Sequence, residues 1–144
     1  MVQFLGGMPP QYGANESAIK GDACKDVRYI RITDIDDNGE LKDIDWKTAA
    51  NIEDKYFLED DDMLFARSGS VGRAFLYKKE FGKAIFAGYL IRFKLDKSKI
   101  LPEFLLFYTL TSLYKHWVRS IHRPSVQANI NSQEYKGLII PLLA

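Results

Sequence analysis

The order of the local sequence patterns constrains the fold of this chain more than any other feature. Four segments rich in β-branched and aromatic residues predict strands, namely residues 27–33, 63–66, 74–77 and 87–93. A helical pattern follows only later, with apolar side chains every three or four residues between Pro102 and Ile121, and Pro124 ends it. Because strands precede helices without regular alternation, we predict an α+β fold. It has a curved, largely antiparallel or mixed β-sheet, one long helix in the C-terminal half and a short helical turn.

Turn signals define the remaining segments. Residues 1–20 contain Gly and Pro with little periodicity, so we expect loop or extended chain there. The Asn-Gly pair at 38–39 suits a tight hairpin turn, with residues 40–45 returning along the first strand. Ser132–Tyr135 suits a short capped helical turn, and residues 138–140 predict a closing strand.

The length and composition are those of one globular domain. The chain has 144 residues, 47% hydrophobic and 27% charged, which is enough to bury a core, and we assign residues 1–144 to a single domain. No apolar run is long enough to span a bilayer, and the N-terminus lacks the features of a signal peptide. The single cysteine, Cys24, cannot form an internal disulfide. We therefore expect a cytoplasmic protein that does not bind membranes.

Charge is divided unevenly along the chain, although the net charge is only +1. Residues 20–62 contain 7 Lys and Arg against 14 Asp and Glu, whereas residues 63–99 contain 9 against 2. Such a division permits one basic face that binds phosphates. It equally permits two surfaces that neutralise each other within the fold, and charge alone does not separate these interpretations.

Residues 34–45 imitate a calcium-binding loop, with Asp or Asn at the first, third and fifth positions and Gly at the sixth. However, a predicted strand precedes this segment where such a loop has a helix, and Asp45 replaces the bidentate Glu of the twelfth position. A turn stabilised by Asp and Asn side chains explains the same residues. We therefore predict a turn and no metal site.

Residues 67–73, Arg-Ser-Gly-Ser-Val-Gly-Arg, are the segment most suggestive of ligand binding. The two glycines let the backbone approach a ligand closely, and the two serines offer hydroxyl groups. Arg67 and Arg73 have the geometry to bind phosphate or to pair with guanine. An ordinary polar hairpin loop is the alternative.

Residues 122–131 place basic, hydroxyl and amide groups in a loop after the predicted helix. Arginine suits guanine edges, and Gln or Asn suits adenine edges, so this loop is a second candidate for base recognition. The alternative is that Asn129 and Asn131 satisfy backbone groups in a turn.

No combination of side chains has the spacing of a catalytic or metal centre. His116 and His122 lie six residues apart and not on one helix face, and no His–carboxylate cluster has metal-ligand spacing. Neither a Ser-His-Asp nor a Cys-His arrangement is supported, and no glycine-rich loop for S-adenosylmethionine is present. We predict that the chain is not an enzyme.

Four segments share their order and spacing with one protein family. They are residues 12–18 (Tyr-Gly-Ala-Asn-Glu-Ser-Ala), 29–35 with Gly39 nearby, 61–72 around Arg-Ser-Gly, and 127–131 followed by 138–142. Together they resemble the target-recognition domain of a type I restriction–modification specificity subunit, over about residues 12–142. Asp61 departs from the pattern, since the family usually has Gly there, so the turn before the next strand can differ. The long helices and second domain of a full subunit are missing, so we expect a fragment of a larger specificity subunit or a truncated gene product.

The resemblance implies DNA recognition without chemistry. The chain is expected to read one half of a bipartite site in double-stranded DNA, as part of a type I restriction–modification complex in bacterial or archaeal defence. Modification (methyltransferase) subunits that use S-adenosylmethionine methylate adenine, and a restriction subunit translocates and cleaves. We expect ATP and Mg in those partner subunits and no cofactor in this chain. Self-association of the fragment is left open.

The candidate DNA contacts come from the loops that carry these motifs. Lys20, Arg67, Arg73 and Arg123 are assigned to phosphate or guanine, and Gln127, Asn129 and Asn131 to base edges. The full predicted set is Tyr12, Gly13, Asn15, Ser17, Lys20, Arg31, Arg67, Ser68, Gly69, Ser70, Arg73, Arg123, Ser125, Gln127, Asn129 and Asn131.

Two other functions are compatible with the residues. The recognition domain of a single-chain adenine methyltransferase–endonuclease would share the fold and the DNA role. A protein-interaction module, with Tyr114 and Trp117 of the predicted helix facing a partner, belongs to a different class. An exposed apolar patch on that helix would favour the second alternative.

Overall fold

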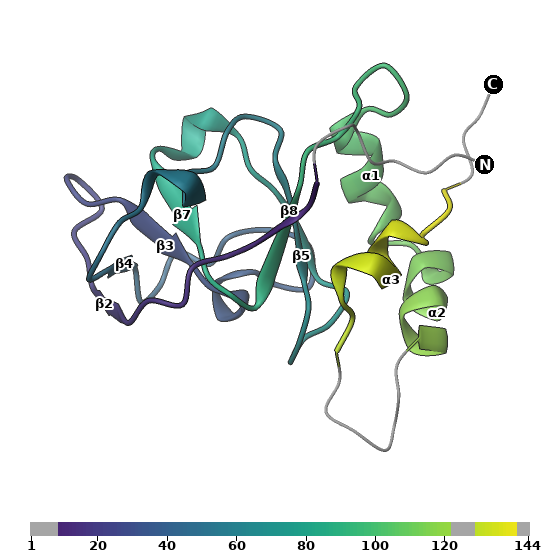
Figure 1. Ribbon diagram of the computed structural model, residues 1–144, viewed down its shortest axis with the longest axis horizontal. Coiled ribbons are helices and arrows are strands. Elements are labelled where there is room, and N and C mark those ends of the chain that lie inside the picture. The colour runs from purple at the N-terminus through teal and green to yellow at the C-terminus, as the bar shows by residue number, and fades with distance from the viewer. Residues whose placement is uncertain (1–8, 122–128, 141–144) are drawn as a thin grey trace.

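A four-stranded antiparallel sheet forms the centre of the computed structural model, which describes residues 9–121 and 129–140 (Figure 1). Its strands, in spatial order, are β1 (Gln11–Tyr12), β8 (Leu90–Phe93), β5 (Met63–Ala66) and β6 (Ala74–Leu76). The strand that leads into the first motif, β1, therefore lies beside β8, and β5, which leads into the 67–73 loop, occupies an interior position.

Two small two-stranded sheets lie at the other end of the molecule from the helices (Figure 1). In one, β2 (Ala18–Lys20) pairs antiparallel with β4 (Lys47–Ala49). In the other, β3 (Arg28–Ile30) pairs parallel with β7 (Ala84–Phe86). Three short 3₁₀ turns, Ile32–Asp34, Asp54–Tyr56 and Lys79–Phe81, connect these strands. The mixture of antiparallel and parallel pairing confirms the α+β class with a mixed sheet.

The helical pattern that predicted one long helix forms two. α1 spans Pro102–Tyr108 and α2 spans Ser112–Ile121, with the short α3 (Ser132–Lys136) following. The interruption has a local cause, because the Thr109 hydroxyl donates to the Leu106 carbonyl and the Thr111 hydroxyl accepts from the Tyr114 amide. Threonine hydroxyls compete in this way with helical hydrogen bonds and favour helix starts.

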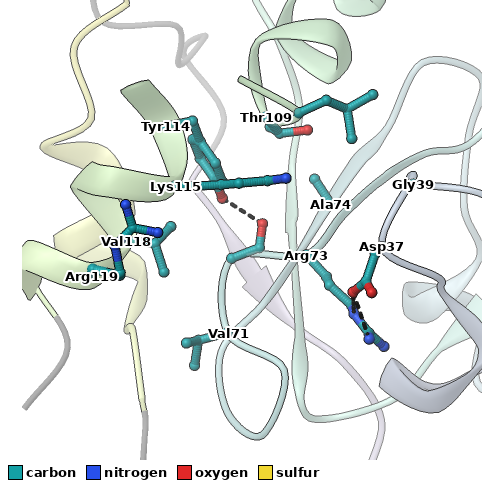
Figure 2. A pocket seen from close by; sticks show the side chains of 12 residues that line it. Asp37, Gly39, Val71, Arg73, Ala74, Thr109, Tyr114, Lys115, Val118 and Arg119 are labelled. Carbon is teal, nitrogen blue, oxygen red and sulfur yellow. Dashed lines mark hydrogen bonds and ion pairs between the residues drawn. The ribbon is translucent and has the colours of Figure 1, made fainter. Parts of the chain in front are cut away.

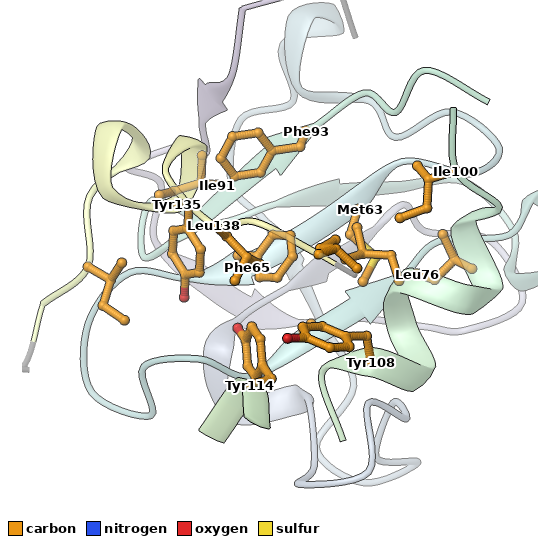
Figure 3. Packing of buried hydrophobic residues seen from close by; sticks show 14 residues of the cluster. Met63, Phe65, Leu76, Ile91, Phe93, Ile100, Tyr108, Tyr114, Tyr135 and Leu138 are labelled. Carbon is orange, nitrogen blue, oxygen red and sulfur yellow. The ribbon is translucent and has the colours of Figure 1, made fainter. Parts of the chain in front are cut away.

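Apolar side chains bury both faces of the central sheet. Met63 and Phe65 of β5 face the helices, where they pack with Tyr114 and Tyr135 (Figure 3). Leu64 and Ala66 face the opposite way, into a cluster with Ile30, Phe75 and Phe86. A strand that is covered on both sides reads as a continuous apolar run rather than an alternating one, which explains the Met-Leu-Phe-Ala sequence of β5.

Several predicted strands are shorter than their sequence patterns. The segment 87–93 contains a turn before β8, and residues 32–34 leave the first predicted strand as a 3₁₀ turn. The turn at 38–39 is confirmed, with Gly39 at φ +77°, but its return strand is reduced to one bridge between Ile35 and Leu41. Within the described chain, residues 138–140 form no extended strand, although Leu138 and Ile140 are buried.

Asp61 adopts φ +70°, a left-handed conformation that glycine accepts without strain. This is the position at which the resemblance pattern usually has glycine. Asp is one of the few other residues that enter this region readily, because its short side chain can form local polar contacts. The backbone of the turn is therefore one that glycine also adopts, and the departure lies in the side chain.

None of the helices within residues 9–121 and 129–140 is long and apolar enough to cross a membrane.

Candidate nucleic-acid interface

The backbone of Arg67 joins three segments that are distant in the sequence. Its amide donates to the Tyr89 carbonyl at 2.9 Å, in the turn immediately before β8. Its carbonyl accepts from the Ile130 amide at 2.8 Å, and Ser68 forms a bridge with Asn129. The structure therefore brings the 67–73 loop and the closing motif together, as the predicted interface requires.

The side chain of Arg67 is held by stacking rather than by an ion pair. Its guanidinium lies over the Tyr12 ring, 4.8 Å from the ring centroid, and Nη1 donates to the Gly88 carbonyl at 3.4 Å. The Nε group is buried without a hydrogen-bond partner, and no carboxylate of the described residues forms an ion pair with Arg67. Its positive charge is therefore uncompensated within that part of the chain, which leaves it free to attract an acceptor.

Two glycines set the position of the opening motif. A Cβ on Gly13 would lie 2.1 Å from the Ala87 carbonyl oxygen. The chain after β1 therefore approaches the turn before β8 closely only because residue 13 is glycine. A Cβ on Gly88 would lie 2.3 Å from Oδ1 of Asn15. The side-chain amide of Asn15 therefore packs directly against Gly88, which precedes Tyr89. It forms no hydrogen bond to the described residues.

An open pocket of about 470 Å³ lies beside this contact. Both apolar and polar residues line it, and Tyr89 among them is 61% exposed. The lining residues are Ala14, Asn15, Glu16, Ala18, Tyr29, Arg31, Ile32, Thr33, Ala87, Gly88 and Tyr89.

Two buried tyrosines hold the 67–73 loop from the helical side. The Tyr114 hydroxyl of α2 donates to the Gly72 carbonyl at 2.7 Å, and the Tyr135 hydroxyl of α3 accepts from the Gly72 amide at 3.1 Å. Tyr135 in turn donates to the Ala66 carbonyl at 2.5 Å. Burial raises the pKa of both phenols, so both remain neutral donors. Sequence reasoning placed Tyr114 on the core-facing side of the helix but gave no signal for these hydroxyl contacts.

Arg31 and Arg73, both predicted DNA contacts, already have acidic partners. Arg31 pairs with Asp34 at 2.8 Å, and this hydrogen bond raises the pKa of the Arg31 guanidinium. Arg73 pairs with Asp37 at 2.7 Å and donates to the Ile35 carbonyl at 2.9 Å. Both arginines therefore fix the 31–39 segment. If either contacts DNA, its guanidinium has to bind the DNA and its acidic partner together.

The same contacts explain the segment that imitates a calcium loop. Asp36 Oδ1 accepts from the backbone amides of Asn38 and Glu40, which is a turn stabilised by an Asp side chain. Asp34 and Asp37 are paired with arginines. No group of three or more His, Cys, Asp or Glu that could hold a metal occurs in the described ranges.

The other predicted residues are dispersed. Lys20 and Ser17 are exposed in or beside β2, at the end of the molecule away from the helices, and are not brought to Arg67 (Figure 1). Gly69, at φ +66°, and Ser70 are exposed in the loop. Asn131 caps α3, since its Oδ1 accepts from the Glu134 amide at 2.9 Å, in agreement with the structural interpretation of this residue. Arg123, Ser125 and Gln127 lie outside the described residues.

Comparison with known proteins relates this arrangement to one family. Residues 15–142 match the family described as type I restriction modification DNA specificity domain. The type I restriction enzyme StySPI specificity subunit of Salmonella potsdam is 30% identical over 145 residues, covering 96% of this chain. The chain corresponds to 30% of the length of that relative. These matches confirm the resemblance found in the motifs: the chain belongs to the family of type I restriction modification DNA specificity domains.

Proposed function

We propose that this chain reads one half of a bipartite site in double-stranded DNA, as the target-recognition part of a type I restriction–modification complex. The observation that carries the proposal is the convergence on Arg67. The opening motif, the 67–73 loop and the closing motif meet there around a guanidinium without an acidic partner among the described residues. Arg67 is half-buried and oriented by its neighbours, and arginine is the side chain most often used for specific contact in the major groove.

The neighbouring groups suit a division between base contacts and backbone contacts. Arg67 has the planar fork that pairs with O6 and N7 of guanine, and the free amide of Asn15 matches the adenine edge. The exposed backbone and hydroxyl of Gly69 and Ser70 suit a phosphate oxygen. In this proposal the chain performs recognition only, and no bond is made or broken on it.

The chemistry then belongs to partner subunits, which act in the cytoplasm. Modification subunits that use S-adenosylmethionine methylate adenine, and a restriction subunit that uses ATP and Mg cleaves. The rest of the specificity subunit joins this domain to them. The chain spans 30% of the relative from Salmonella potsdam, so these assignments concern the larger assembly.

The protein-interaction alternative loses the two residues on which it was based, although Phe107 on α1 and Leu113 on α2 are apolar and exposed. A protein-interaction surface through Tyr114 and Trp117 requires that face of α2 to be exposed. Tyr114 is only 1% exposed, and Trp117 packs against the Tyr135 ring at 5.8 Å between centroids. This face of α2 therefore belongs to the core.

Methylation profiling tests the proposed function. The specificity subunit that contains this chain is expressed with its modification subunits, and methylated adenines are mapped over the host genome. We expect an asymmetric motif of two short parts separated by a fixed gap. A continuous motif would instead favour the recognition domain of a single-chain methyltransferase–endonuclease, and no methylation dependent on the subunit would contradict both.

A further inference from the structure

Helix α2 presents two parallel rows of side chains next to the 67–73 loop. Tyr114 and Val118 point inward, where Tyr114 binds the Gly72 carbonyl and Val118 lies so close that a Cβ on Gly72 would be 2.8 Å from it. Lys115 and Arg119 follow these residues by one position each and form the adjacent row, because residues four apart share one helix face. The contacts that fix the loop thus also fix the position of two cations beside it.

These two cations line an open pocket of about 320 Å³ between α2 and the loop. Figure 2 shows Lys115 extending from α2 toward the side of the pocket that contains Ala74. Arg73 is a third lining cation, and the acidic residue of this lining is Asp37, which already pairs with Arg73. The pocket therefore has an excess of positive charge.

Lys115 and Arg119 are both exposed, and neither forms an ion pair with a described carboxylate. Two exposed lysines in the loop before α1 differ in this respect. Lys97 pairs with Asp61 at 2.7 Å, and Lys99 pairs with Asp96 at 3.8 Å. The uncompensated charge on α2 thus lies at the end of the molecule where β5 leads into the loop (Figure 1).

We propose that Lys115 and Arg119 bind neighbouring phosphates of one DNA strand. The duplex then runs along α2, while Arg67 faces its groove. This inference rests on the proposed function. Phosphate is the favoured ligand because both side chains are long, exposed cations without the buried support that a base-reading fork needs. Such contacts position the protein on DNA and carry no sequence information.

The test measures DNA affinity against salt concentration for the specificity subunit assembled with its modification subunits. Fluorescence anisotropy is recorded with a cognate duplex and a scrambled duplex from about 50 to 200 mM salt. Each phosphate contact contributes about 0.9 to the slope of log affinity against log salt. We expect the Lys115→Ala/Arg119→Ala variant to lower the slope by about 2 and to weaken both duplexes by similar factors, leaving their ratio unchanged.

Two further variants separate a local site from a general charge effect. Lys97→Ala/Lys99→Ala removes the same formal charge from the loop before α1, and we expect almost no change of slope. Asp37→Asn removes the acid beside Arg73 and should strengthen binding to both duplexes. An equal loss of slope in the Lys97/Lys99 variant would overturn the inference, since net charge alone would then explain the result.

The remaining outcomes are also decisive. An unchanged slope in the Lys115/Arg119 variant, with normal sequence-specific binding by the wild type, would overturn this inference and leave the proposed function intact. A wild-type complex without any preference for the cognate duplex would contradict the proposed function itself. A variant that no longer assembles with the modification subunits would identify the row as a protein contact and would overturn the inference.

Discussion

Tyr12 supports the guanidinium of Arg67 on its ring face, 4.8 Å from the centroid, while its hydroxyl accepts a hydrogen bond from the Ser132 amide at 3.1 Å. One side chain therefore connects β1, the loop after β5 and the start of α3. A cation over an aromatic face is held in orientation without losing its charge. This is the arrangement that a base-reading arginine requires, since its fork must be positioned before DNA arrives.

Substitution of Arg67 should remove discrimination at one base pair. We expect Arg67→Ala to weaken cognate binding by about 1–3 kcal/mol and to relax specificity at a single position. Arg67→Lys retains the charge but lacks the planar fork, so the salt dependence should remain near that of the wild type while the discrimination is lost. Competition binding with duplexes altered one base pair at a time measures both effects. Full discrimination by Arg67→Lys would contradict a bidentate role.

Gly88 and Gly13 should separate DNA recognition from stability. Gly88→Ala places a methyl group 2.3 Å from Oδ1 of Asn15, the end of an exposed side chain that can move away. We expect a loss of stability below about 1 kcal/mol together with altered base preference, as for Asn15→Ala. Gly13→Ala meets the Ala87 backbone at 2.1 Å and should be destabilised toward the upper end of about 1–3 kcal/mol. Denaturant unfolding and the competition assay distinguish the two, and equal destabilisation would show that Gly88 has no special relation to Asn15.

The buried tyrosine contacts should stabilise the loop measurably. Tyr135→Phe leaves the Gly72 amide and the Ala66 carbonyl without this partner, so we expect a loss of about 1–3 kcal/mol in unfolding free energy. Tyr108→Phe is the matched control, because the Tyr108 hydroxyl forms no hydrogen bond within the described part of the chain. Its loss should be much smaller. Equal effects in urea unfolding would indicate that the Tyr135 hydroxyl is not a structural link.

Asp61 should stabilise the fold in a pH-dependent manner. Hydrogen bonds from Lys78 and Lys97 lower the pKa of its carboxyl group. A carboxyl whose folded pKa is lowered adds stability above its unfolded pKa of about 3.9, and this stability is lost as the pH falls through the folded value. Asp61→Asn should therefore be less stable than the wild type at neutral pH, with the difference shrinking below about pH 4.

The conformation of Asp61 provides a second comparison. Asn also tolerates φ +70°, whereas Ala does not, so Asp61→Ala should be less stable than Asp61→Asn by about 1 kcal/mol at every pH. Thermal unfolding at several pH values measures both differences. A gap between the two variants that disappears at low pH would mean that backbone strain is not its cause.

Local chemistry explains what the sequence could predict. The strand patterns at 63–66 and 74–77 locate two strands of the four-stranded sheet, and the Asn-Gly turn at 38–39 forms as expected, because these features depend on nearby residues. The long helix was predicted as one element because apolar periodicity continues through Leu110. The helix is interrupted by hydrogen bonds of the Thr109 and Thr111 hydroxyls, and a pattern of apolar residues does not reveal such bonds.

Contacts between residues that are distant in the sequence could not be predicted from local patterns. The pattern identified Arg31, Arg67 and Arg73 as candidate cations, but only the tertiary arrangement pairs Arg31 and Arg73 with acids and leaves Arg67 on Tyr12. Lys115 and Arg119 were missed because most amphipathic helices carry Lys or Arg on their outer face. Their proximity to the 67–73 loop depends on the packing of α2.

A domain exchange tests whether this chain selects one half of a bipartite site. Residues 12–142 replace the aligned segment of the specificity subunit of the Salmonella potsdam relative, and adenine methylation is mapped in cells that also express that relative's modification subunits. We expect that one part of the methylated motif changes and the other part is retained, and that Arg67→Ala in the exchanged segment relaxes only the changed part. A motif in which both parts change, or in which neither does, would contradict this expectation.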